Sequence, residues 1–561
     1  MTSCFAIAAA LAVAGPVLRP QLIDSDRLMT EPIQAAIDAC HAQDGGEVVI
    51  PAGVFRTGGL VLKSGVTLRL EDGARLEGSR NPDDYPTGPD ARRWYRGLIR
   101  ADGAHDIAVI GGRGAVLSGM NCYDPKGEER YRGPHGILFF GCTNVVLSGY
   151  SFRDSGNWAH ALFKCRNLTV RDVKVFGGHD GLDVHDSEDV LVERCEFHCG
   201  DDAIAGFANH HVTVRDCLLD CSCNAIRFGG SDSLFERCRV PERSTWGHRW
   251  TLTEEQKRAS VTDGRTRHGV CAFFCYYCDM RWQIRRPQSG IVVRDCDIEA
   301  PVQSFGMAFD GRNQWCCNRP LVSIAFENCH FRRTTVPANF IGGETEPLAL
   351  TFDRCSFAPA PGHEGEPLVS GFNFSRIFLK DVSATGYARP RIERRSAAGV
   401  VEITGGTALE TVSREDPDDR ILTFGELERV LEVRQGDEAG WTSWANGVSS
   451  SDDLSTGNYW GLAMAVWRGE VRSPEAVGRR FRGQYSYCTG FDRNGKVAER
   501  LGGALSDLPA GPFAFALAQY DPVSARAFLT DYVRSKIPPS EASVWGVRKA
   551  LEKLTDRTGG K

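Results

Sequence analysis

Short segments in which apolar and polar residues alternate recur along most of the chain. Early copies are NVVLSGYSF from Asn144, NLTVRDVKV from Asn167, DVLVERCEF from Asp189 and HVTVRDCLL from His211. Later copies are GIVVRDCDI from Gly290, VSIAFENCHF from Val322 and LALTFDRCSF from Leu348. An alternation with a period of two predicts half-buried β-strands. No segment of this length buries its apolar face alone, so the copies are expected to pack on one another.

The spacing of these segments decides how they pack. Val173, Cys195 and Cys217 occupy the same place in their segments and are 22 residues apart, and Cys238 follows after 21. A sandwich of hairpins would show two-residue turns and a strand about every 8–12 residues. Turns of about two dozen residues, stacked at about 4.8 Å, would instead place like residues on like. The sequence therefore predicts an all-β fold, a parallel β-helix solenoid.

At the two ends of the chain, the spacing of apolar residues differs from that of the repeated segments. The segment PIQAAIDACHAQ, from Pro32, has helical spacing and predicts a helical cap over the open end of the solenoid. Beyond the last repeats, amphipathic segments such as GELERVLEVRQ and DPVSARAFLTDYVRSK predict a mainly helical appendage of unknown role. The expected organisation is an N-terminal segment over 1–29, a β-helix domain over 30–410 and a C-terminal region over 411–561.

Composition narrows the function and the compartment. The net charge is −6 with acids and bases interspersed, so no basic stripe marks a nucleic-acid-binding protein. No apolar run reaches the roughly 18 residues of a membrane span. Phe5 to Ala14 has the character of a signal-peptide core but lacks a preceding Lys or Arg. The chain has 20 cysteines, many in the repeat register, which favours a cytoplasmic over a secreted location. The oligomeric state is left open.

Candidate chemistry lies in the stretch GGHDGLDVHDSEDVLVERCEFHCGDDAIAGF, which starts at Gly177. Asp180, Asp202 and Asn224 are spaced by 22 residues, so they are expected to form one column on three adjacent turns, with Asp201 next to it. Carboxylates about 5 Å apart repel each other, which raises a pKa and retains a proton. Such a cluster supplies the acid and the base of glycosidic-bond hydrolysis. For Asp183, capping a turn is an equally good interpretation.

The amino-acid sequences of several segments resemble those of a known family. IQAAIDAC, GGEVVIPAGVFRTGGLVLKSGVTLRLEDGARLEGS, HDGLD and GDDAIA are similar to the polygalacturonase family of pectin-degrading glycoside hydrolases over roughly residues 30–380. The resemblance implies a right-handed β-helix, hydrolysis with inversion and an oligo- or polysaccharide substrate. It also implies that Asp201 is the general acid and that Asp180 and Asp202 polarise the attacking water. Neither a metal nor a cofactor is implied.

The sequence departs from the family pattern at the expected substrate contacts. Gly178-His179 stands where the family has Asn-Thr, and Cys223-Asn224-Ala225 stands in place of Gly-His-Gly. The family's Arg-Ile-Lys aligns with Cys271-Ala272-Phe273, so its basic pair is missing. Arg227 is a candidate replacement for that pair, and three histidines remain candidates for the missing one: His160, His185 and His268. The expected substrate-binding residues are Asn224, Arg227, His179, Asp183 and Trp158.

Two other functions remain open. A polysaccharide lyase on the same scaffold would use the carboxylates to hold Ca²⁺ and an Arg, for example Arg227, as the base. A non-catalytic glycan-binding solenoid would carry the aspartates as a relic. The spacing of the three aspartates favours the hydrolase.

Overall fold

The structure is a computed structural model of the 561-residue chain. It describes residues 15–86, 96–123, 133–247, 268–278, 286–309, 316, 319–343 and 346–414, and in the C-terminal region 514, 517–518, 522–534, 547, 550–551 and 554. The chain forms two compact units. The first consists of Met1–Tyr277, Gln288–Met307 and Leu321–Asp416, and the second of Cys278–Pro287, Ala308–Pro320 and Pro417–Lys561.

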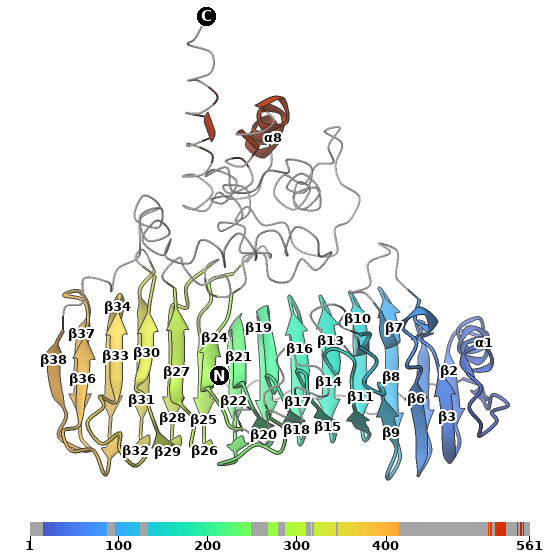
Figure 1. The fold of residues 1–561 in the computed structure, drawn as a ribbon, viewed down its shortest axis with the longest axis horizontal. Coiled ribbons are helices and arrows are strands. Elements are labelled where there is room, and N and C mark those ends of the chain that lie inside the picture. The colour runs from blue at the N-terminus through green and yellow to red at the C-terminus, as the bar shows by residue number, and fades with distance from the viewer. Residues whose placement is uncertain are drawn as a thin grey trace, which may run out of the picture. The chain divides into compact units, whose positions relative to one another are not determined.

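The first unit is a parallel β-helix whose strands pair only with the turns before and after them (Figure 1). The first ladder of strands carries the candidate site. It comprises β4 (Leu60–Val61), β7 (Gly97–Asp102), β10 (His135–Phe140), β13 (His160–Phe163), β16 (Leu182–His185), β19 (Ile204–Arg215), β21 (Asn224–Ser231), β24 (Ala272–Tyr276), β27 (Gln303–Ala308), β30 (Ala338–Ile341), β33 (Val369–Phe372), β36 (Arg391–Arg394) and β38 (Glu410–Ser413).

The second ladder follows the first in each turn, and the long strand β19 belongs to both. The other members of the second ladder are β1 (Val17–Leu18), β2 (Gly46–Ile50), β5 (Val66–Leu70), β8 (His105–Gly111), β11 (Thr143–Ser148), β14 (Arg166–Arg171), β17 (Glu188–Glu193), β22 (Ser233–Glu236), β25 (Ile291–Arg294), β28 (Ser323–Glu327), β31 (Leu348–Asp353), β34 (Phe374–Lys380) and β37 (Val400–Thr404).

The third ladder completes each turn and forms a separate 12-stranded sheet. Its members are β3 (Gly53–Thr57), β6 (Ala74–Gly78), β9 (Val116–Ser118), β12 (Ser151–Arg153), β15 (Lys174–Gly177), β18 (Glu196–Cys199), β20 (Leu218–Cys221), β23 (Arg239–Val240), β26 (Asp297–Glu299), β29 (His330–Thr334), β32 (Ser356–Pro359) and β35 (Ser383–Ala384). All the pairings in the three ladders are parallel, so the predicted parallel β-helix is confirmed.

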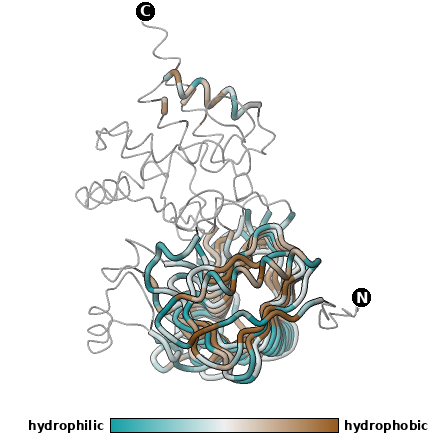
Figure 2. The backbone as a smooth tube through the Cα atoms, turned by 90° about the vertical axis from the view of Figure 1, so that its right-hand side faces the viewer, coloured by the Kyte–Doolittle hydropathy of each residue, from teal (hydrophilic) through white to brown (hydrophobic). Residues whose placement is uncertain are grey.

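The corner between the second and third ladders explains the repeated cysteines. Each corner has one residue in the left-handed region, for example Arg194 (φ 51°) and Asp216 (φ 56°). The next residue turns inward and is buried, as Cys195 and Cys217 are. The thiol of Cys217 then donates to the carbonyl oxygen of Arg215 at 3.2 Å. Figure 2, a view along the stack, shows the turns superposed with apolar positions recurring at the same places. The cysteines therefore serve as small core residues at one corner.

The helix expected near the N-terminus is present as α1 (Thr30–His41), followed by a short 3-10 helix η1 (Pro82–Asp84) further along the chain. Helix α1 lies beside β2 at the N-terminal end of the stack (Figure 1). It buries Ile33, Ile37 and Cys40, the face predicted by its apolar spacing. That it serves as a cap stays a prediction.

The C-terminal region contains one helix with described bounds, α8 (Pro522–Arg534). The other segments expected to be helical, and the N-terminal residues 1–14, lie outside the described residues. The predicted boundaries near 29 and 410 remain predictions. Among the described helices, none combines the length and the apolar character needed to cross a bilayer.

Candidate active site

The predicted column of aspartates lies where chain segments enter successive strands of the first ladder. The N–H of Gly181 donates to the carbonyl oxygen of Asp202 at 2.9 Å, and the N–H of Ala203 donates to that of Asn224 at 3.1 Å. These bonds join the turns in register, so the three side chains stand on adjacent turns. We call the set that shares this register the acidic column: Trp158, Asp180, Asp202 and Asn224.

Asp202 is a fully buried carboxylate with its oxygens occupied by donors. Its Oδ1 accepts from the backbone N–H and from the Nδ2 of Asn224, both at 2.8 Å. Its Oδ2 accepts from Nη1 of Arg227 at 3.1 Å. Hydrogen bonds of this kind favour the ionised form of a carboxyl group. Asn224 and Arg227, both expected to contact substrate, thus hold a carboxylate in this structure.

Asp180 lies in a different environment one turn earlier. Its Oδ1 accepts the backbone N–H of Asp202 at 3.0 Å, and the side chain is buried. Burial raises the pKa of Asp180 well above its usual value, the charges of Asp183, Asp201 and Asp202 raise it further, and Arg227 lowers it. The surroundings of Asp180 therefore disfavour its ionised form, whereas Asp202 has hydrogen-bond donors on both carboxyl oxygens.

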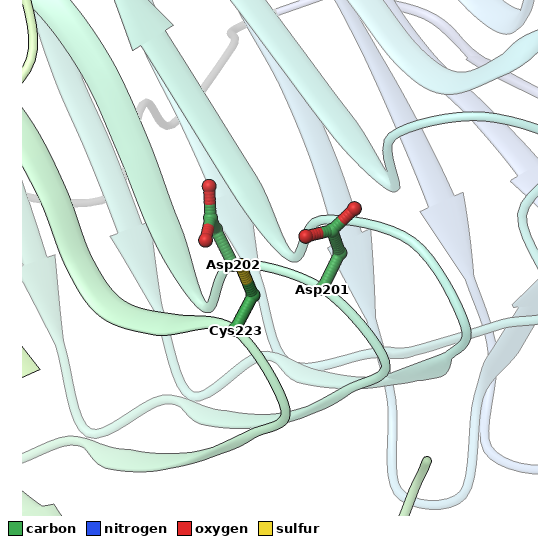
Figure 3. A group of neighbouring side chains, drawn as sticks. All are labelled: Asp201, Asp202 and Cys223. Atoms are coloured by element: carbon green, nitrogen blue, oxygen red, sulfur yellow. The ribbon is translucent and has the colours of Figure 1, made fainter. Parts of the chain in front are cut away.

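Asp201 projects beside Asp202 and is partly exposed. Figure 3 shows their two carboxyl groups on the same side of the turn, with Cys223 next to them. Ligand-type atoms of the three residues all lie within 4.8 Å of one another. Burial, followed by the charges of Asp202 and Asp201, raises the pKa of Cys223 well above its usual value, so its thiol keeps its proton.

Asp201, Asp202 and Cys223 are close enough to one another to hold a cation, but their chemistry does not suit one. Asp202 already accepts hydrogen bonds from Arg227 and Asn224, and a guanidinium at 3.1 Å repels a second cation. A protonated thiol is also not a metal ligand until it loses its proton. This donor set suits proton transfer better than metal binding.

Arg227 is fixed from two sides. Besides its ion pair with Asp202, its guanidinium carbon lies 4.0 Å from the ring centroid of Tyr277. The strand register places Arg227 two turns beyond Asp183, with Ala205 between them, as the spacing predicts. Asp183 is buried, and its Oδ1 lies 3.5 Å from Nε2 of His185.

Aromatic rings line up on the same strands. His185 stacks on Phe163 with ring centroids 5.0 Å apart and meets Phe207 at 4.5 Å, and Trp158 lies 5.7 Å from His185. Phe207 then meets Tyr277 at 4.9 Å. These rings lie on successive turns, and the last of them, Tyr277, contacts the guanidinium group of Arg227. This arrangement places Trp158 and His185 among aromatic partners on the first ladder.

The histidines considered as replacements for the missing family histidine are His160, His185 and His268, and His185 packs among the aromatic rings described above. His160 is in the core, where its Nδ1 donates to the carbonyl oxygen of Gly181 at 3.0 Å and burial lowers its pKa to about 4, so it is excluded. His268 donates from Nδ1 to the carbonyl oxygen of Ser244 at 3.2 Å. His179, directly before Asp180, is buried with its ring 6.2 Å from that of Tyr123.

Two neighbours of the site were missed in the sequence. In the sequence, Cys223 stands out only as a departure from the family pattern. It follows Asp201 by 22 residues, however, so the period alone places it next to Asp201 on the following turn. Tyr277 could not be found in this way, because the insertion after Val240 breaks the period before β24 begins at Ala272.

Comparisons with known proteins show what the chain is similar to. The family described as "Right handed beta helix region" matches residues 98–240. An exo-poly-alpha-D-galacturonosidase of Dickeya chrysanthemi is 54% identical over 115 residues, which make up 19% of this chain and 18% of that protein. A probable polygalacturonase of Vitis vinifera is 24% identical over 204 residues, 32% of this chain and 41% of that protein.

A solved exopolygalacturonase structure from Thermotoga maritima aligns at 15% identity with a TM-score of 0.47, over 66% of this chain and 94% of the other. The chain matches less than half the length of the two curated relatives. Within that range the predicted resemblance is confirmed. The β-helix of this chain is thus similar, over part of its length, to polygalacturonase-like glycoside hydrolases.

Proposed function

We propose that this chain is a glycoside hydrolase that cleaves O-glycosidic bonds of a pectin-like or related plant or microbial glycan, with inversion at the anomeric carbon. The observation that carries the proposal is the unequal environment of neighbouring carboxyl groups. Asp180 is pushed toward its protonated form by burial and like charge, whereas Asp202 is held by Arg227 and Asn224. A cluster in which one carboxyl group tends to keep a proton and another has donors on both oxygens can supply both the acid and the base that glycoside hydrolysis requires.

In this proposal, Asp201 donates a proton to the glycosidic oxygen, because it is the partly exposed member of the three. Asp202 acts as the general base: it accepts a hydrogen bond from the attacking water and takes the proton that the water loses. Asp180 fixes the turn by accepting the N–H of Asp202, and its own proton orients the water. The Cys223 thiol, protonated beside the two carboxyl groups, adds no negative charge to them.

Substrate contacts follow from the charges and rings beside the column. Arg227 carries the positive charge next to the carboxyl groups and is a candidate to bind a uronate. Trp158 at the start of the acidic column offers a flat apolar face of the kind that stacks on a sugar. Because the family's basic pair is absent, a neutral or unusual sugar next to the scissile bond is the alternative substrate.

The test is the Asp201→Asn variant. We expect hydrolysis of oligogalacturonate or of an active aryl glycoside to fall by a factor of about 10² or more, because general-acid catalysis contributes that much. Time-resolved NMR of the released sugar reports the anomer, and circular dichroism reports the fold. Full activity in a correctly folded Asp201→Asn variant would overturn the assignment.

The lyase alternative receives less support from the contacts. Calcium prefers an all-oxygen site, whereas this cluster contains a thiol. The base proposed for a lyase, Arg227, is engaged in an ion pair with Asp202. A product absorbing near 235 nm and an activity abolished by EDTA would nevertheless reverse this order.

A further inference from the structure

A buried carboxylate outside the acidic column holds the start of the insertion that follows Val240. Asp220, at the end of β20, is 4% exposed and has three donors. Its Oδ1 accepts the backbone N–H of Thr245 at 2.9 Å, and its Oδ2 accepts the hydroxyl of Thr245 at 2.5 Å. Nδ1 of His198 donates to the same Oδ2 at 2.7 Å. Such a carboxylate orders the chain segment that supplies its donors.

Neighbouring residues tie down the same segment, residues 244–247, which we call the strap. The hydroxyl of Ser222 bonds both the hydroxyl of Ser244 and the carbonyl oxygen of Trp246. His268, where the described chain resumes, donates to the carbonyl oxygen of Ser244 at 3.2 Å. Both described ends of the insertion are thus joined at the strap.

The strap lies against the turn that carries Asp201 and Asp202. A Cβ atom placed on Gly200 would be 2.9 Å from the carbonyl oxygen of Gly247 and 2.5 Å from that of Gly178. Contacts this short are accepted only without a side chain, so the glycine directly before Asp201 is closed in by the strap on one side and by the preceding turn on the other.

His198 keeps Asp220 ionised. The two residues are aligned on adjacent turns of the third ladder, and His198 stacks on Phe176 of the turn before, with ring centroids 4.8 Å apart. Burial pushes the pKa of Asp220 upward, but the hydrogen bonds from His198 and Thr245 outweigh it and the pKa lies below its ordinary value. The anion persists through the neutral range, and so does its hold on the strap.

We propose that Asp220 is a positioning residue for the candidate active site: it holds the strap against Gly200 and so fixes the turn that carries Asp201 and Asp202. The inference rests on the proposed function for its catalytic meaning. The mechanical part of it, the coupling between strap and turn, stands on the contacts alone. Asp220 touches neither of the two aspartates in the described contacts and acts through the backbone of residues 244–247.

Hydrogen exchange in the full chain tests the coupling. The variants are Asp220→Ala and Asp220→Asn, with Asp216→Ala as the matched control, because Asp216 is an ion-paired aspartate of the same turn whose partner is the half-exposed Arg237. In Asp220→Ala we expect exchange of the Thr245 amide to rise by about tenfold or more, the factor expected when hydrogen bonds to a charged acceptor are lost.

The decisive peptide is the one over residues 199–203. The amides of Gly200 and Asp202 donate to the carbonyl oxygen of Gly177 and to Oδ1 of Asp180, and both are expected to exchange faster in Asp220→Ala. Asp220→Asn, which keeps an acceptor, should restore part of the protection, and Asp216→Ala should change neither peptide. Unchanged exchange over 199–203 in Asp220→Ala would overturn the inference. If that variant fails to fold, Ser222→Ala is measured with the same two expectations.

Kinetics separate this inference from the proposed function. With oligogalacturonate as the probe, Asp220→Ala should lower kcat by about tenfold with a smaller change in KM, since positioning acts on the chemical step. A wild-type chain that hydrolyses none of a panel of glycans would defeat the proposed function while the exchange result still decides the coupling. An active wild type with unchanged kcat in Asp220→Ala would defeat the positioning role alone.

Discussion

At the residue scale, the site depends on two carboxyl groups in different environments on adjacent turns. Asp202 has hydrogen-bond donors on both oxygens. Asp180 is buried beside like charges, which destabilises its anion. A carboxyl group held in this way reduces the stability of the fold, because an amide of the same shape would not carry the penalty. The arrangement is therefore explained better by chemistry at the site than by packing.

A pH-dependent stability follows for Asp180. Its pKa is 3.8 in an ordinary environment and is raised in the folded chain, so above pH 3.8 unfolding releases a proton. The stability contributed by the protonated form is therefore lost as pH rises through the raised pKa. We expect the stability of Asp180→Asn relative to the wild type to be higher at pH 8 than at pH 5, by about 1.4 kcal/mol for each pH unit of that interval that lies below the raised pKa.

Urea unfolding of both proteins at the two pH values measures this difference. Asp83→Asn is the control, since Asp83 has a side chain that is 76% exposed. An Asp180→Asn variant whose stability relative to the wild type does not rise from pH 5 to pH 8 would contradict the expectation. The carbonyl oxygen of Asn still accepts the N–H of Asp202, so the substitution keeps that hydrogen bond.

At the scale of elements, alternating charges lock the second ladder in register. The residues Glu193, Arg215, Glu236 and Arg294 are aligned on successive turns and alternate in sign. Glu236 is 5% exposed and accepts from Arg294 at 2.6 and 2.8 Å. A slip by one turn would bring like charges together, so the column penalises the wrong stacking order.

The energetic weight of this column is testable. Glu236→Ala leaves Arg237 and Arg294 without their shared carboxylate, and we expect a loss of about 1–3 kcal/mol in the free energy of unfolding. Asp172→Ala breaks a half-exposed pair with Arg194 on the neighbouring column and should cost less than about 1 kcal/mol. Urea unfolding of the two variants gives the comparison. Equal losses would mean that burial does not set the strength of these pairs.

At the scale of the whole molecule, the β-helix has a core of its own. The described buried hydrophobic residues of the first unit run without a break in the ladders from Ile33 in α1 to Ile392 in β36. Each turn covers the apolar face of the one before it, so the stack does not need the C-terminal region to form a core. The predicted boundary near residue 410 therefore implies that the β-helix folds without the C-terminal region.

A chain ending after residue 414 tests that boundary. We expect it to give a β-rich circular dichroism spectrum and one cooperative thermal transition, because adjacent turns stabilise one another. The full chain under the same conditions is the control. A shortened chain that is soluble but melts without cooperativity would place part of the core beyond the boundary.

The sequence by itself determined the β-helix, the register of the turns and the column of Asp180, Asp202 and Asn224. Those features depend on a period of about 22 residues, and a period is a local property that can be counted along the chain. Only the tertiary structure decided what the column's neighbours do. Arg227 pairs with Asp202 and rests on Tyr277, and Asp220 holds the strap against Gly200, across an insertion where counting fails. The burial and the electrostatic environment of a site residue depend on segments that are distant in sequence. These segments come together only when the chain folds.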